Sequence, residues 1–169
     1  MEVKIVNFGS VKVAGYLHKT SHSNNTIPAF WGEFMADGRH KRLHDADFVK
    51  SHSEFGVCFM INDDDMDYVI GLEVKPGAQV SQEFHVCEIP ASDYAVFKVP
   101  PYSLNEPSVN IQKTWGQAFE WLATSEYHHN NKASFELYFP ACTCGTDTDC
   151  AVCNSGEMHC DIYISVDKK

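Results

Sequence analysis

The chain has 169 residues, a length typical of one domain or of two small halves that share a core. Apolar residues make up 44% of the sequence, which is enough to form a folded core and excludes wholesale disorder. Lys and Arg total 13 against 23 Asp and Glu, so the net charge is −10. This charge disfavours direct binding to nucleic acid and favours cationic partners.

The start of the chain, MEVKIVNFGSVKVAGYL, argues against export. Apolar and polar residues alternate there, and an acid stands at Glu2, whereas a secretory signal has a basic start followed by an apolar run. No apolar stretch reaches the roughly 18 residues that a membrane span needs. We therefore expect a cytoplasmic protein with reduced thiols and no membrane partner.

Hydrophobic periodicity and turn residues predict the secondary structure in chain order. Helices are predicted at 27–38, ending near Gly38, and at 109–127. The second helix has one apolar face, formed by Ile111, Trp115, Phe119 and Leu122. Strands are predicted at 11–20, 56–61, 68–74, 83–90, 94–99, 135–140 and 160–166.

The predicted order of strand, helix, strand, strand occurs twice, and the two passes match in sequence. VKIVNFGSVKVAGYL aligns with FHVCEIPASDYAVFK, Trp31-Gly32 with Trp115-Gly116, and FGVC with FELY, at offsets of 81, 84 and 80 residues. Similar segments at a fixed offset indicate a duplicated unit. We predict a single α+β domain over 1–169, with one repeat at about 1–80 and the other at about 81–169.

The predicted fold is a duplicated β-α-β-β unit with pseudo-twofold symmetry. It has an antiparallel sheet, helices packed on the sheet, and a ligand cleft. Because side chains alternate along a strand, Glu136 and Tyr138 share one face of their strand. The repeat mate of Glu136 is Gly56, which has no side chain. The predicted cleft therefore has one negative charge, aromatic walls and open space at Gly56, although an acid on a strand often faces solvent instead.

Each of the two paired tryptophans precedes a glycine inside a predicted helix. A glycine there costs about 1 kcal/mol relative to alanine, which suggests close packing of helix on sheet or room beside the indole. Core packing and pocket lining both stay open for Trp31 and Trp115. For Phe119 the helical spacing favours core packing.

Seven segments resemble the GyrI-like superfamily, and most of all its stand-alone, integron-associated effector-binding proteins. The same module is the ligand-sensing domain of AraC-type and MerR-type multidrug regulators. The resemblance runs from about residue 3 to residue 166. The segments are IPAFWGEFM, FGVCFMIND, DYVIGLEV, IPASDYAVFKV, TWGQAFEWL, FELY and CDIYISV.

The resemblance implies a pocket acid at Glu136 that pairs with hydrophobic organic cations of the drug-like, multidrug type. It implies aromatic walls at Trp115 and, less directly, at Trp31, Tyr138 and Phe119. The sequence shows no helix-turn-helix domain before the module, so direct control of transcription is not expected. The segment between the last two predicted strands is also longer than a short turn and forms a Cys-rich insertion at 141–160.

The leading hypothesis is therefore a module that binds a cationic aromatic small molecule, either to sequester it or to sense it with a separate protein partner. Two alternatives follow from relatives in the superfamily. One is a hydrolase of electrophilic small molecules in which Glu136 activates water. The other is an inhibitor that binds a partner protein through its surface. The sequence has no nucleophile motif such as G-x-S-x-G, which favours binding over catalysis.

Four cysteines in the insertion form a possible metal site. Cys142 and Cys144 form C-x-C, and Cys150 and Cys153 form C-x-x-C. Four soft ligands in a short polar loop suit a closed tetrahedral structural zinc. A redox pair, or no shared role, are the alternatives.

Two histidines form a second possible metal site. His40 and His44 are spaced i, i+4, with Asp47 nearby, and this spacing could place metal ligands on one helix face. The surrounding GRHKRLHDAD is polar all round, so we interpret it as a solvated segment.

Overall fold

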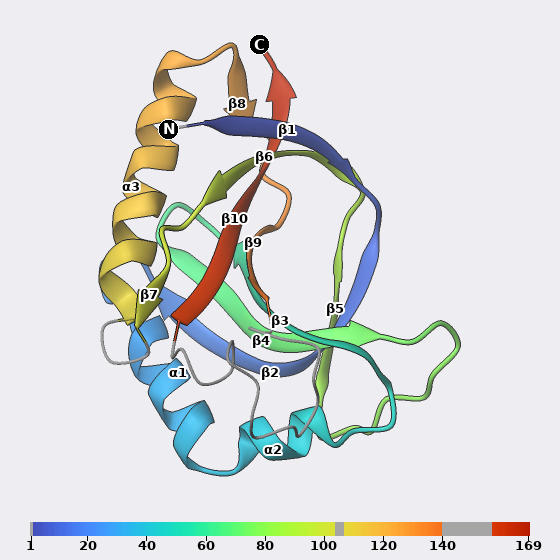
Figure 1. Cartoon of the computed structure of the whole chain (residues 1–169). Coiled ribbons are helices and arrows are strands. Elements are labelled where there is room, and N and C mark those ends of the chain that lie inside the picture. Colours follow the sequence, from blue (N-terminus) through green and yellow to red (C-terminus); the bar gives the residue numbers. More distant parts are fainter. Residues whose placement is uncertain (1, 104–106, 140–156) are drawn as a thin grey trace.

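The computed structural model describes residues 2–103, 107–139 and 157–169. Its helices are α1 (Ile27–Ala36), α2 (Arg39–His44) and α3 (Pro107–Thr124), and its strands form one antiparallel sheet (Figure 1). The strands are β1 (Val3–Phe8), β2 (Val11–Ser21), β3 (Val49–Met60), β4 (Asp65–Val74), β5 (His85–Ile89), β6 (Ser92–Lys98), β7 (Tyr102–Ser103), β8 (Tyr127–His129), β9 (Ser134–Phe139) and β10 (Glu157–Lys168). The α+β antiparallel fold predicted from the sequence is confirmed.

The order of the strands is symmetric about the centre of the sheet. The order is β1-β6-β10-β9-β3-β4-β2-β5, with β7 and β8 added to β10. Exchanging β1 with β5, β2 with β6, β3 with β9 and β4 with β10 reverses this order, as expected for two related halves. At the centre, Gly56 of β3 lies directly opposite Glu136 of β9.

The first half has one more strand at its start than the sequence predicted, β1, whereas the corresponding strand of the second half, β5, was predicted at 83–90. β1 pairs with β6 of the other half, and β5 pairs with β2. The unit is therefore strand, strand, helix, strand, strand, and the two halves exchange their first strands. The residues of β1 were included in the repeat alignment, but no strand was predicted there. The sequence preference for strand is weak and depends on context at the edge of a sheet.

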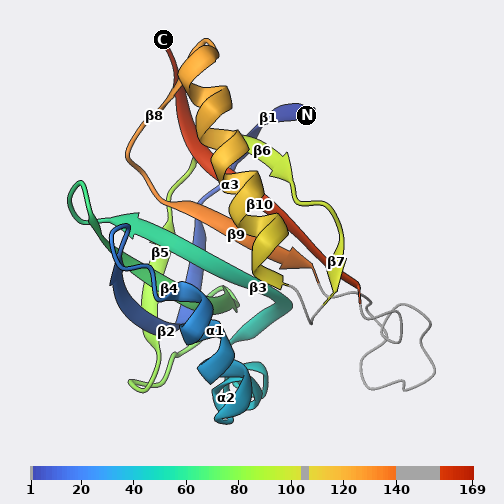
Figure 2. The same ribbon diagram turned by 90° about the vertical axis from the view of Figure 1, so that its left-hand side faces the viewer.

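The helices lie on one face of the sheet, and a separate cluster fills the other face. Figures 1 and 2 show α1 and α3 on the same side, one over each half. Under α1 and α2 lies a cluster that includes Phe34 and Leu72, and under α3 lies one that includes Leu122 and Ile162. Phe135 belongs to the third cluster, on the opposite face. No helix in the described part of the chain is long and apolar enough to cross a membrane.

The segment interpreted as solvated forms a helix with a buried anchor. α2 places Leu43 in the core with 0% of its surface exposed, so the segment is not polar all round as interpreted, although its other residues are exposed or half-buried. A single apolar residue in a charged segment produces no hydrophobic periodicity, so the sequence pattern did not predict that Leu43 is buried.

The cysteines of the predicted zinc site, Cys142, Cys144, Cys150 and Cys153, lie outside the described residues, and that site stays a prediction.

The helical glycines have no packing reason to be glycine. A Cβ added at Gly32 or Gly116 would meet no heavy atom within 4 Å, so close packing of helix on sheet does not explain either one. Gly15 differs, because a Cβ there would overlap the Ile70 carbonyl oxygen of the neighbouring strand. The glycines of the sheet and of the helices therefore have different roles.

We predict that Gly116→Ala stabilises the protein by about 0.5–1 kcal/mol, because alanine has the higher helix propensity. Gly15→Ala should destabilise it by about 1–3 kcal/mol through overpacking. Urea denaturation of both variants measures the two free energies of unfolding. Loss of stability in Gly116→Ala would show that the glycine has a structural role in α3.

Candidate functional site

A large cavity opens between α1 and α3 on the helix-covered face of the sheet. Its volume is about 950 Å³, and Figure 2 shows the two helices flanking β3 and β9. This size is near the upper end of small-molecule sites. Its apolar lining includes Trp31, Met35, Trp115, Phe119, Tyr138 and Met158.

The carboxylate of Glu136 lies in the wall of this cavity. β9 alternates as predicted, with Glu136 and Tyr138 on the cavity face and Phe135 in the cluster behind the sheet. Only 5% of the surface of Glu136 is exposed. The neighbouring strands β3 and β10 cover the backbone of β9 on both sides, which fixes the direction of the side chain.

Three donors hold the Glu136 carboxylate. Trp115 of α3 donates from Nε1 to Oε1 at 2.7 Å. The hydroxyls of Tyr68 and Tyr138 donate to Oε2 at 2.7 and 2.9 Å. Trp31 of α1 donates from Nε1 to the Tyr68 hydroxyl at 2.8 Å. The carboxylate is thus linked to both helices.

Burial dominates the protonation of Glu136. Desolvation raises its pKa above the ordinary value, and the hydrogen bonds from Trp115, Tyr68 and Tyr138 offset only part of this effect. Within the described parts of the chain, no ion pair includes Glu136. The site therefore has a desolvated carboxylate that is hydrogen-bonded but has no counter-ion from these residues.

The space predicted opposite Glu136 at Gly56 is filled. A Cβ on Gly56 would overlap the Tyr68 hydroxyl and lie 2.8 Å from Glu136 Oε2. Gly56 is not part of the cavity lining. The expectation of open space there was wrong, because the glycine makes room for Tyr68 from the next strand, β4. Sequence reasoning missed Tyr68, because the pattern around it indicated only a strand at 68–74.

The aromatic walls come from both helices. Trp31 packs against Tyr138 with ring centroids 4.9 Å apart, and Trp115 stacks on Phe119 at 5.8 Å. Phe119 is 52% exposed and lines the cavity, so the interpretation of it as a core residue was wrong. Both tryptophans pack on the core and line the cavity at once. Gly32 also lines the cavity, next to Trp31.

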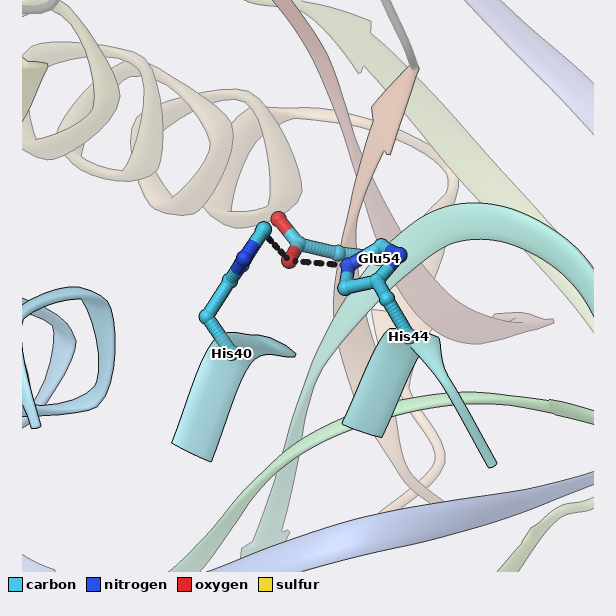
Figure 3. A group of neighbouring side chains, drawn as sticks. All are labelled: His40, His44 and Glu54. Carbon is cyan, nitrogen blue, oxygen red and sulfur yellow. Dashed lines mark hydrogen bonds and ion pairs between the residues drawn. The ribbon is translucent and has the colours of Figure 1, made fainter. Parts of the chain in front are cut away.

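A second acid, Glu54, lines the same cavity but is paired. It lies two residues before Gly56, on the same face of β3, and histidines of α2 contact it (Figure 3). Burial opposes its ionisation, but the hydrogen bonds from His40 and His44 outweigh this effect and lower its pKa. Sequence reasoning missed Glu54, although its i−2 relation to Gly56 placed it on the cavity face.

The chain matches the family described as integron-associated effector binding protein over residues 4–166. A candidate transcription regulation protein from Staphylococcus aureus MU50 has a similar structure, with 18% identity, 98% of each chain covered and a TM-score of 0.71. SAV2435 bound to tetraphenylphosphonium is similar at 18% identity, with 99% and 94% covered and a TM-score of 0.71.

An integron cassette protein from Vibrio cholerae is similar at 14% identity, with 98% of this chain and 95% of that chain covered and a TM-score of 0.66. No curated protein matches the chain in sequence. At these identities the structural likenesses establish the fold alone.

The raised pKa of Glu136 predicts how stability depends on pH. The folded protein holds the Glu136 proton more tightly than the unfolded chain does, so this contribution to stability is complete below the unfolded pKa. It is lost as pH rises through the raised folded pKa. From about pH 4 upward, Glu136→Gln should therefore gain stability relative to the native protein. Urea denaturation over a pH series measures this difference, and a difference that is constant with pH would contradict the raised pKa.

Proposed function

Since the chain belongs to the family of integron-associated effector binding proteins, we propose that it binds hydrophobic organic cations in the cavity between α1 and α3. The observation that carries the proposal is the buried Glu136 carboxylate in an aromatic cavity. A buried carboxylate without a counter-ion is costly. A bound cation would supply the missing charge and lower that cost.

The hydrogen bonds of Glu136 favour one class of cation. Oε2 already accepts two hydroxyl donors and Oε1 accepts one indole donor. A cation that needs no hydrogen bond, such as a quaternary or charge-delocalised ion, leaves these bonds intact. A primary ammonium has three donors to satisfy and is expected to bind less well.

The aromatic walls support the same class of ligand. Trp31, Trp115 and Tyr138 surround the acid, and a cation over such rings gains about 0.5–2 kcal/mol. Tetraphenylphosphonium, which is bound to the structurally similar SAV2435, is a cation of this kind, since its charge is enclosed by phenyl rings. We extend that ligand chemistry to this chain as part of the proposal.

Binding is favoured over hydrolysis as the role of Glu136. Its hydrogen bonds from Trp115, Tyr68 and Tyr138 stabilise the ionised form and hold it in place, which suits a fixed counter-ion. A general base needs a free lone pair directed at water, and the three donors leave only one of the four lone-pair positions of the carboxylate, on Oε1, without a partner. The proposal includes two purposes for ligand capture, which are sequestration of the ligand and sensing of the ligand with a separate partner protein.

Glu136→Gln tests the proposal with tetraphenylphosphonium as the probe. The variant keeps the size of the side chain and removes its charge, so the affinity for the cation should fall at least tenfold, by about 1.4 kcal/mol. The affinity for neutral triphenylphosphine oxide should change little. Isothermal titration calorimetry, or quenching of tryptophan fluorescence, measures both affinities.

Glu88→Gln is the matched control, because it removes the same charge from an exposed side chain of β5. It should leave both affinities unchanged. Equal losses for the cation and the neutral compound in Glu136→Gln would mean that the carboxylate only supports the structure of the cavity. A loss of cation affinity in Glu88→Gln would attribute the effect to net charge.

A further inference from the structure

Three potential metal ligands converge where α2 meets β3. His40 and His44 project from successive turns of α2, and the Glu54 carboxylate lies between their rings (Figure 3). Oε1 of Glu54 lies 3.2 Å from Nε2 of His40 and 2.9 Å from Nε2 of His44. One ligand atom from each residue lies within 4.8 Å of the other two.

This spacing is close to what a transition-metal ion requires. Bonds of 2.0–2.2 Å to zinc place two ligand atoms of a tetrahedral site about 3.3 Å apart. The observed separations from Glu54 Oε1, 2.9 and 3.2 Å, need only small side-chain movements to reach this value. Imidazole nitrogen and carboxylate oxygen are ligands of Zn²⁺, Co²⁺ and Ni²⁺.

His52 supplies the outer partner that a metal-binding histidine usually has. Nδ1 of His44 lies 2.9 Å from Nδ1 of His52, and the two rings stack at 5.1 Å. If Nε2 of His44 binds the metal, its other ring nitrogen can donate to His52. Such outer contacts orient the ligand ring and strengthen binding.

The scaffold fixes the geometry of the three ligands. Leu43, between the two histidines in sequence, is fully buried and anchors α2. The His40 ring packs against Phe34 of α1 in a T-shaped pair, with ring centroids 5.5 Å apart. Glu54 belongs to β3, which pairs with strands on both sides. The ligands therefore come from packed elements.

We propose that His40, His44 and Glu54 form a binding site for a divalent transition-metal ion, with zinc as the reference ion. Three protein ligands leave one tetrahedral position for water. The site shares no residue with the predicted cysteine site. It does not depend on the proposed binding of organic cations, although Glu54 also lines that cavity. Asp47, the acid that the sequence placed near the histidines, is replaced in this set by Glu54 of the following strand.

The test uses the full chain with Cys142, Cys144, Cys150 and Cys153 changed to Ser, so that thiolates of the insertion do not bind the added metal. Titration of the chelator-treated protein with Zn²⁺ should show one equivalent bound. His40→Ala, His44→Ala and Glu54→Gln should each weaken binding by about 100-fold, and His52→Ala by about tenfold. His85→Ala, at an exposed histidine of β5, is the control and should bind zinc as tightly as the parent.

Two results would overturn the proposal. One is a parent protein that binds no zinc, which would make the cluster an ordinary ion pair of Glu54 with histidine. The other is binding that is equally strong in His44→Ala. Because an alanine variant could fail to fold, nitrogen NMR of the imidazoles in the parent protein provides an independent measurement. Zinc should shift the ring resonances of His40 and His44, with those of His85 unchanged. Shifts at His85 alone would also contradict the site.

Discussion

One buried carboxylate links the parts of this protein that form its cavity. Glu136 accepts hydrogen bonds from Trp115 of α3 and from Tyr68 of β4, and Tyr68 in turn accepts one from Trp31 of α1. A buried carboxylate is tolerated only where donors stabilise it. These donors come from both halves of the chain, so satisfying one acid fixes the position of the two helices that enclose the cavity.

The duplication provides a symmetric scaffold, and the chemistry of the cavity depends on breaking that symmetry. At the central strand pair, Glu136 faces Gly56, so one half supplies an acid and the other supplies the room for Tyr68. The paired tryptophans differ in the same way. Trp115 donates to the acid directly, whereas Trp31 reaches it through Tyr68. The aromatic cavity is therefore asymmetric in charge, because the carboxylate of Glu136 has no counterpart at Gly56.

Two acids that line the cavity, Glu54 and Glu136, have opposite environments. Glu54 is paired with His40 and His44, and its pKa is lowered. Glu136 has no ion-pair partner among the described residues, and its pKa is raised. Glu54 is therefore held by two histidines, whereas Glu136 is held by neutral hydroxyl and indole donors, so the proposed function places the cation next to Glu136. The overall charge of −10 favours the approach of cations but does not determine this position.

The sequence by itself determined the α+β fold, the duplication and the face of β9 that carries Glu136, because strand alternation and a repeated pattern are local properties of the chain. Only the tertiary structure brought Tyr68 over Gly56, exposed Phe119 to the cavity and placed Glu54 between His40 and His44. Each of these contacts joins residues of different elements or depends on which side of a helix meets the sheet. These contacts are determined by strand pairing and helix packing over the whole domain. A short stretch of sequence does not predict them.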